Sequence, residues 1–203
     1  ADAARLLRIR GRAMQEAVPV GAGAMAALLG LDFDAAVAVA ADAAQGQVCQ
    51  AANDNGGGQV VISGDKAAVE RAAEIAKARG AKRAMLLPVS APFHCALMAP
   101  AADVMAKALA EQPPRPPLVP VVANVTARPV RDPVEIRDLL VQQVTATVRW
   151  RESVAAMKEA GVDTVIELGA GKVLAGLVKR IDPELAAGSV GTPAEIEAFL
   201  KTV

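Results

Sequence analysis

The sequence predicts an α/β protein that contains a ferredoxin-like subdomain at residues 20–89. Within this range, short apolar runs alternate with amphipathic stretches in the order βαββαβ, which defines the ferredoxin-like arrangement. From about residue 90 onward, apolar runs again alternate with stretches of helical periodicity, and that alternation is typical of a parallel sheet. Capping residues, glycines and prolines then indicate where each element begins and ends.

Before residue 90, a first amphipathic helix precedes the βαββαβ unit. Residues 1 to about 17 carry apolar side chains on one side and arginines on the other, and Pro19 ends this helix. Asp32 or Asp34 supplies an N-cap for a helix that runs to about Ala44. The other expected elements are strands at 24–29, 47–52, 59–62 and 83–89, a glycine-rich turn at 53–58, and a helix from Gly64-Asp65 to about Arg79.

After residue 90, the sequence predicts more helices than strands. We expect helices at 96–111, 132–144 and 150–160, a stiff linker at 112–117, strands at 118–123 and 162–168, a helix to about 179, and a last helix from 192. The second strand is typical of a buried one. Gly169-Ala170-Gly171-Lys172 follows it and opens a helix, but lacks the P-loop spacing. Because no further βα unit is expected after it, we interpret it as a tight turn and not as a nucleotide site.

The composition excludes several classes of function. Lys+Arg and Asp+Glu balance at 22 each and aromatic residues make up 2%, which argues against a nucleic-acid partner. We find no apolar run as long as a membrane span, and no signal-peptide pattern at the N-terminus. The first residues are instead typical of the middle of a helix. Cys49 and Cys95 form no ligand motif, so we expect reduced thiols in a cytoplasmic protein.

His94 is the only histidine of the chain and the first candidate for chemistry. A lone histidine cannot build a multi-histidine metal site, and we expect neither a metal nor a cofactor. A single histidine is more often a structural residue than a catalytic one. However, this one follows a strand expected to end at Val89, and Pro88 and Pro92 stiffen its loop. These features favour the general base of an acyl transferase.

A nucleophile to accompany this base is not evident. The serines at 63, 90, 153 and 189 all lie outside G-x-S-x-G, the strained turn that exposes a hydroxyl for acyl transfer. Cys95 adjoins His94, but adjacent residues seldom face each other, so we expect a small packed residue. The first helix carries arginines at 5, 8, 10 and 12. They either form a solvated basic face, or turn one guanidinium inward to grip a carboxylate.

A co-linear set of segments resembles the malonyl-CoA:acyl-carrier-protein transacylases and the related acyltransferase domains of polyketide synthases. The segments run the length of the chain, and together they are specific although each alone is weak. They are Arg10–Pro19, Gly23–Ala27, Gln59–Gly64, the loop around His94, Pro120–Val125, Gln143, Trp150 and Glu167–Leu174.

This resemblance implies a two-part fold and a covalent reaction. Residues 1–19 and 90–203 would form an incomplete α/β-hydrolase-like large subdomain, into which the ferredoxin-like subdomain at 20–89 is inserted. In the family, a serine attacks malonyl-CoA while a histidine takes its proton. The malonyl group then passes from the serine ester to the phosphopantetheine thiol of acyl carrier protein, a step of fatty acid biosynthesis.

The resemblance also assigns roles to individual residues. His94 matches the catalytic histidine, and Gln143 matches the residue whose backbone carbonyl orients the imidazole. Arg10 matches the arginine that binds the malonyl carboxylate. Asn124 and Gln59 match polar positions near the pocket. Phe93 resembles the corresponding residue of enzymes that accept malonyl and not methylmalonyl groups, because its ring would fill the space of an α-methyl group.

Two family features are absent from this sequence: the G-H-S-x-G serine and the oxyanion loop that precede the matched region. We therefore expect a C-terminal portion whose partners are malonyl-CoA, acyl carrier protein and a missing N-terminal segment that carries the nucleophile serine. Two alternatives stay open. One is a fragment of a polyketide synthase acyltransferase, and the other is a non-catalytic binding or scaffold protein of the same fold.

Overall fold

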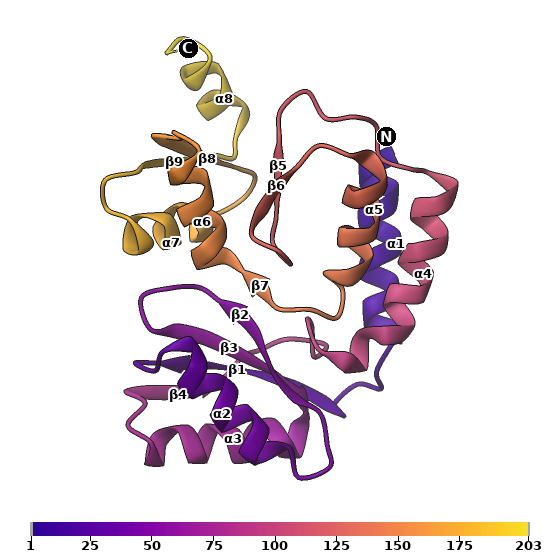
Figure 1. Cartoon of the computed structure of the whole chain (residues 1–203), viewed down its shortest axis with the longest axis vertical. Coiled ribbons are helices and arrows are strands. Elements are labelled where there is room, and N and C mark those ends of the chain that lie inside the picture. Colours follow the sequence, from indigo (N-terminus) through magenta and orange to yellow (C-terminus); the bar gives the residue numbers. More distant parts are fainter. Residues whose placement is uncertain (1, 203) are drawn as a thin grey trace.

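A five-stranded sheet, in the order β4-β1-β3-β2-β7, forms one half of the molecule in the computed structural model, which describes residues 2–202 (Figure 1). Its strands are β1 (Gly23–Leu29), β2 (Cys49–Asp54), β3 (Gln59–Asp65), β4 (Arg83–Leu86) and β7 (Val148–Arg149). The first four run antiparallel to their neighbours, and β7 is added parallel to β2. The βαββαβ order is confirmed, although a strand from the second half of the chain joins the same sheet.

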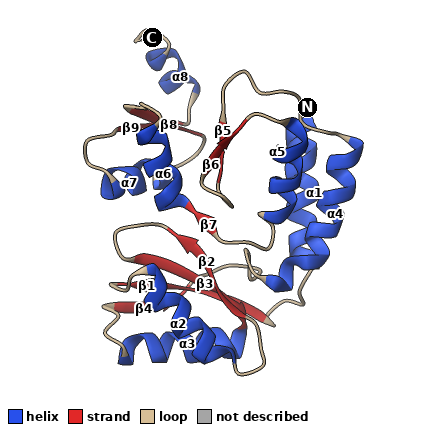
Figure 2. Ribbon diagram, in the orientation of Figure 1, coloured by secondary structure: helices blue, strands red, loops and turns tan. Residues whose placement is uncertain are grey.

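Two helices, α2 (Phe33–Ala44) and α3 (Lys66–Ala78), cover one face of this sheet (Figure 2). The core between them and the sheet is built mainly from alanine, with Leu28, Val39 and Ile62 fully buried. Such small side chains let helix and sheet backbones approach closely. Of the two expected caps, Asp32 is the one used, because its carboxylate accepts a hydrogen bond from the Ala35 amide at 2.7 Å.

The opposite face of the sheet meets a cluster of helices. This cluster contains α1 (Asp2–Glu16), the 3-10 turn η1 (Ala96–Met98), α4 (Ala99–Glu111) and α5 (Pro133–Gln142). Helices α1, α4 and α5 pack side by side around buried residues such as Met14, Met98 and Leu109 (Figure 2). The loop that carries His94 runs between this cluster and the sheet.

The third group of elements lies beyond β7. It contains β5 (Val121–Ala123), β6 (Arg128–Val130), α6 (Trp150–Glu159), β8 (Thr164–Leu168), α7 (Val173–Ile181), β9 (Ala186–Val190) and α8 (Pro193–Phe199). Strands β5 and β6 form an antiparallel pair, and β8 and β9 form a parallel pair. Within residues 2–202, neither pair gains a third strand.

The parallel sheet expected after residue 90 is confirmed only in the β8–β9 pair of the described residues, and the expectation is wrong for β5, which pairs antiparallel with β6. Strands β6, β7 and β9 were not predicted, because each is short and β9 consists largely of alanine, glycine and serine. The expectation that no βα unit follows Gly169–Lys172 is also wrong, since β9 and α8 follow. Strand β8 is not buried, and Leu168 is 78% exposed, because β9 is the only strand beside it within the part of the chain that the structure describes.

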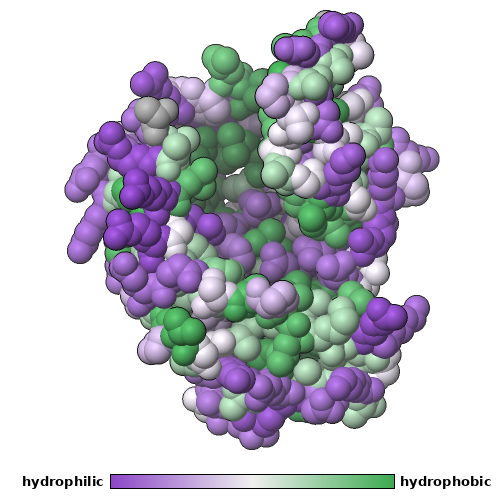
Figure 3. All heavy atoms as spheres, turned by 180° about the vertical axis from the view of Figure 1, so that it is seen from behind, coloured by the Kyte–Doolittle hydropathy of each residue, from purple (hydrophilic) through white to green (hydrophobic). Residues whose placement is uncertain are grey.

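A largely apolar cavity of about 540 Å³ separates the two strand pairs. Val122 and Pro129 line it from the β5–β6 pair, and Val165 lines it from β8. Trp150 also borders it, with an indole N–H that is buried but has no hydrogen-bond partner within residues 2–202. The space-filling view shows the molecule hollowed between its two upper lobes, with apolar residues inside (Figure 3).

Three further observations concern the described residues. None of their helices combines the length and the apolar character that crossing a bilayer requires. They contain no group of three or more histidine, cysteine, aspartate or glutamate side chains placed to hold a metal ion. Cys49 and Cys95 are both free and buried.

Candidate active site

The loop around His94 is held in an unusual backbone conformation. His94 has a φ of 58°, in the left-handed region that costs a non-glycine residue about 1 kcal/mol or more. Two hydrogen bonds flank it: the Cys95 thiol donates to the Pro92 carbonyl at 3.2 Å, and the Ala96 amide donates to Gln50 Oε1 at 2.7 Å. The first bond stabilises the loop itself, and the second attaches the loop to β2. Together they restrict the position of the imidazole.

Gly23 explains how this loop approaches the sheet. A Cβ atom at position 23 would lie 2.3 Å from Cγ of Pro92, which is far closer than any real contact. Glycine is therefore required at the start of β1 because the proline ring occupies the space of a side chain. A larger residue there would push the His94 loop away from the sheet.

The imidazole of His94 is oriented by a backbone carbonyl. Its Nδ1 lies 3.0 Å from the carbonyl oxygen of Gln143, at the end of α5. Because a carbonyl can only accept a hydrogen bond, Nδ1 must carry the proton. In the neutral imidazole, Nε2 then holds a lone pair, as a general base requires. Among residues 2–202, Nε2 has no hydrogen-bond partner.

The surroundings keep this base unprotonated near neutral pH. Burial lowers the pKa of His94 below its usual 6.5, and the positive charge of Arg10 lowers it further. The carbonyls of Gln143 and Ala146 act in the opposite direction and raise it, but burial is the largest effect. The net decrease leaves Nε2 free to accept a proton at pH 7.

Arg10 is the arginine of α1 that turns inward. Arg5, Arg8 and Arg12 are exposed, whereas Arg10 is partly buried, and burial lowers its pKa. Its guanidinium remains charged because the pKa of arginine starts so high. Within residues 2–202 it makes no ion pair and no hydrogen bond. A half-buried cation without a partner, close to the histidine, is suited to bind an anionic group of a substrate.

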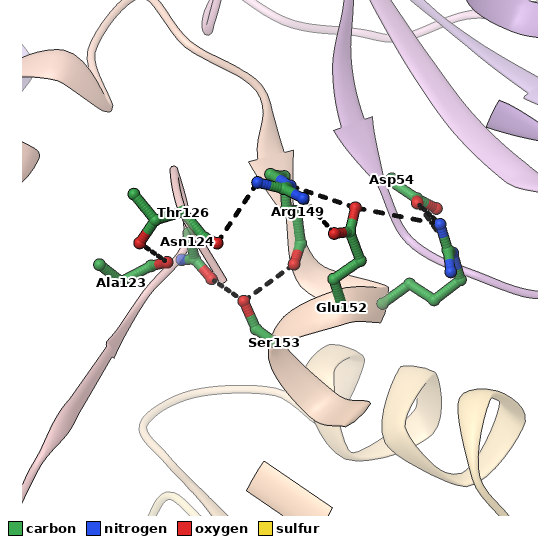
Figure 4. Close-up of polar contacts among 8 residues, drawn as sticks. Asp54, Ala123, Asn124, Thr126, Arg149, Glu152 and Ser153 are labelled. Atoms are coloured by element: carbon green, nitrogen blue, oxygen red, sulfur yellow. Dashed lines mark hydrogen bonds and ion pairs between the residues drawn. The ribbon is translucent and has the colours of Figure 1, made fainter. Parts of the chain in front are cut away.

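The structure brings some of the other candidates near this centre. Phe93 is partly buried between the helical cluster and the face of the sheet formed by Met25, Ala52 and Val61. Asn124 shares a cavity of about 180 Å³ with Gln143. Asn124 is also tied to α6, because its side-chain oxygen accepts a bond from Ser153 at 3.4 Å (Figure 4).

Gln59 lies apart from the His94 loop. It begins β3, whereas the loop contacts the other end of the sheet, where Gln50 pairs with Ser63. Four residues of strand between Gln59 and Ser63 span about 13 Å. The side chain of Gln59 instead accepts a hydrogen bond from Arg180 at 2.7 Å. Gln50 was not predicted as a site residue, because a polar strand residue between apolar neighbours carries no signal of such a role.

The described residues offer no evident nucleophile for this base. Ser63 and Ser153 are 0% and 1% exposed, and Ser90 bonds to Gln15 at the surface. Burial raises the pKa of both thiols, that of Cys49 to about 11, so neither is a ready thiolate. The arrangement is that of an α/β protein with a carbonyl-oriented histidine base and an adjacent anion site.

The comparisons with known proteins agree with this class. The chain belongs to the acyl transferase domain family, whose pattern matches residues 1–187. The malonyl CoA-acyl carrier protein transacylase of Escherichia coli K12 is 52% identical over 202 residues, which are 99% of this chain. The chain spans 65% of the length of that relative.

Solved structures give the same result. An acyl-carrier-protein S-malonyltransferase from Bartonella henselae is 56% identical with a TM-score of 0.94, and covers 99% of this chain and 64% of its own. A malonyl-transacylase solved in complex with a type II polyketide synthase acyl carrier protein is 46% identical with a TM-score of 0.93, over 98% of this chain and 64% of its own. The resemblance seen in the sequence is thus confirmed at the level of the family.

Proposed function

We propose that this chain is the larger part of a malonyl-CoA:acyl-carrier-protein transacylase. The observation that carries the proposal is the His94–Gln143 pair at 3.0 Å with Arg10 beside it. A general base and a cation for a carboxylate are the two groups that malonyl transfer to a serine needs. The names of the relatives support this substrate and this carrier protein.

In this proposal each residue has one role. His94 Nε2 takes the proton of the attacking serine and returns it to the leaving thiolate of coenzyme A. Arg10 binds the malonyl carboxylate, and the Gln143 carbonyl holds the imidazole in the required tautomer. In the second half-reaction, the same base takes the proton of the phosphopantetheine thiol, whose sulfur attacks the ester, and then gives that proton to the serine oxygen that leaves. Malonyl-CoA is a substrate in this scheme, and no cofactor takes part.

A further segment, which carries the serine, completes the proposed site. The apolar cavity between the β5–β6 and β8–β9 pairs and the unpartnered indole N–H of Trp150 support an additional strand there. That strand would join both pairs into one sheet of an α/β-hydrolase-like large subdomain, made with residues 1–19 and 90–203. Residues 20–89 would then form the inserted ferredoxin-like subdomain.

The same chemistry would serve a polyketide synthase, and the relative solved with a polyketide carrier protein keeps that alternative open. A non-catalytic scaffold is less well supported. A scaffold has no need of a histidine held at positive φ or of a half-buried arginine without a partner.

Intact-mass spectrometry after incubation with malonyl-CoA tests the proposal. The chain is assayed alone and together with the part of the relatives that it does not match. We expect a malonyl adduct only in the mixture, carried by the added segment, and its loss when carrier protein is supplied. An adduct on this chain alone would overturn the assignment of the nucleophile, and no adduct in a folded mixture would overturn the function.

A further inference from the structure

We infer that Thr147 is a positioning residue for His94, acting through the turn formed by residues 143–147. The inference rests on the proposed function of His94 as the base. It begins from four hydrogen bonds in series. The Thr147 hydroxyl donates to the Ala51 carbonyl of β2 at 2.6 Å. The amide nitrogen of the Gln143 side chain donates to the carbonyls of Ala146 at 2.8 Å and Thr147 at 3.3 Å.

The fourth bond brings the series to the imidazole. The backbone carbonyl of Gln143 accepts from His94 Nδ1 at 3.0 Å. The side chain of Gln143 therefore closes the turn that aims its own carbonyl at the histidine, and Thr147 fastens the turn to the sheet. This gives the glutamine side chain a purpose, although it is the backbone of this residue that meets the base.

The Ala51 carbonyl that accepts from Thr147 lies at an irregular part of β2. The register of β2 against β3 shifts between Ala51 and Asn53, as at a β-bulge. Strand β7 pairs with β2 only at Val148 and Arg149, immediately after the turn. The Thr147 hydroxyl thus contacts β2 at the point where the turn that begins at Gln143 meets strand β7.

The backbone of Gln143 is held by the end of α5, where its amide donates to the Leu139 carbonyl at 2.9 Å, but its side chain has few contacts. Its side-chain oxygen is buried and has no hydrogen-bond partner within residues 2–202. The orientation of the amide is therefore set by the two carbonyls that accept from its nitrogen. If the carbonyl of Thr147 moves, the side-chain amide loses its fixed position, and only the end of α5 then orients the Gln143 carbonyl.

Thr145 provides a matched control within the same turn. Its hydroxyl donates to the Gln142 carbonyl at 3.4 Å, a contact within the end of α5 that does not reach the sheet. Thr145→Val and Thr147→Val remove the same atoms from neighbouring positions. Only the second breaks the series that ends at His94.

Nitrogen-15 NMR of His94 tests the inference, because it is the only histidine in the chain. The chain is labelled with ¹⁵N-histidine and studied with the unlabelled complementary segment, so that one imidazole is observed. We expect the Nδ1–H tautomer in the parent, in Thr145→Val and in Thr147→Ser. In Thr147→Val we expect partial loss of that tautomer. We also expect a lower His94 pKa, because the carbonyl bond raises it.

The charged group that acts on His94 among the described residues is Arg10, which none of these variants changes. If Thr147→Val does not fold, Gln143→Leu removes the middle of the series and must give the same change in tautomer. An unchanged His94 spectrum in either folded variant would overturn the inference. Malonyl transfer is measured separately: we expect kcat to fall about tenfold in Thr147→Val with KM unchanged. A change in tautomer without any transfer in the parent would refute the function and leave the positioning intact.

Discussion

The guanidinium of Arg151 joins α6 to the end of β2 through the carboxylate of Asp54. Nε and a terminal nitrogen of Arg151 both lie 2.8 Å from Oδ2 of Asp54, whose side chain is only 4% exposed. The other oxygen of Asp54 accepts from the Gly56 amide at 3.2 Å. A second pair, between Arg149 and Glu152, lies beside the first (Figure 4). These contacts hold β7 and α6 against the sheet.

We therefore predict that Arg151→Met destabilises the protein. The substitution leaves the buried carboxylate of Asp54 without its counter-charge, which we expect to cost about 1 to 3 kcal/mol in the free energy of unfolding. The value is moderate because Arg151 is itself half exposed. Urea unfolding measures it, with Arg137→Met as the control, because Arg137 pairs with Asp138 at the surface. Equal effects of the two substitutions would contradict the role given to Asp54.

A second prediction concerns Arg10 and the charge of the acyl group. Arg10→Met removes the cation that binds the malonyl carboxylate, so we expect transfer from malonyl-CoA to fall about 100-fold or more. Transfer from acetyl-CoA has no carboxylate to lose and should change little. Arg10→Lys keeps the charge without the planar fork and should give an intermediate loss. The measurement is the ratio of kcat/KM for the two substrates. An equal loss with both substrates would contradict the binding of the malonyl carboxylate by Arg10.

A third prediction is that stability depends on pH through His94. Its pKa is lowered in the folded state, so the unfolded chain binds the proton more readily. The free energy of unfolding should therefore decrease as pH falls below about 6.5, and this decrease should end below the folded pKa. In His94→Gln the decrease over this window should be absent. Urea unfolding at several pH values gives the free energy of unfolding of the two proteins. The same dependence on pH in both would show that burial does not lower the pKa of His94.

Phe93 offers a fourth prediction, on extender-unit choice. Phe93 directly precedes His94, and its side chain packs against both the helical cluster and the sheet. Phe93→Ala should open space for an α-methyl group and raise the acceptance of methylmalonyl-CoA relative to malonyl-CoA by about 1 to 3 kcal/mol in kcat/KM. Competition between the two substrates measures this ratio. Equal preference in the parent protein would show that the ring does not select.

Much of the fold was readable from the sequence because its signals are local. Asp32 was one of two expected caps for α2, Gly64-Asp65 marked the start of α3, and the periodicity of α1 identified its apolar side. Strand β9 was missed because alanine, glycine and serine carry little strand preference. The parallel sheet expected after residue 90 was confirmed only for β8 and β9 among the described residues, since strand pairing depends on which other strands are present.

The site was readable in part for the same reason. His94 was singled out by its place after a strand and between prolines, and Arg10 was one of four similar arginines. Three other features depend on tertiary approach: the positive φ of His94, the packing of Pro92 on Gly23 and the reach of Thr147 to Ala51. Nothing in local sequence patterns encodes such contacts between distant segments.

The most direct test of His94 as the general base is to compare the rate of serine acylation with and without the imidazole. His94→Gln keeps the approximate size of the side chain but removes the base. Quench-flow with malonyl-CoA follows the first turnover of the chain mixed with the segment that carries the serine. We predict that the acylation rate of His94→Gln is 10²- to 10⁴-fold lower than that of the parent, with an unchanged melting temperature at pH 8. A rate within about threefold of the parent would show that His94 is not the base.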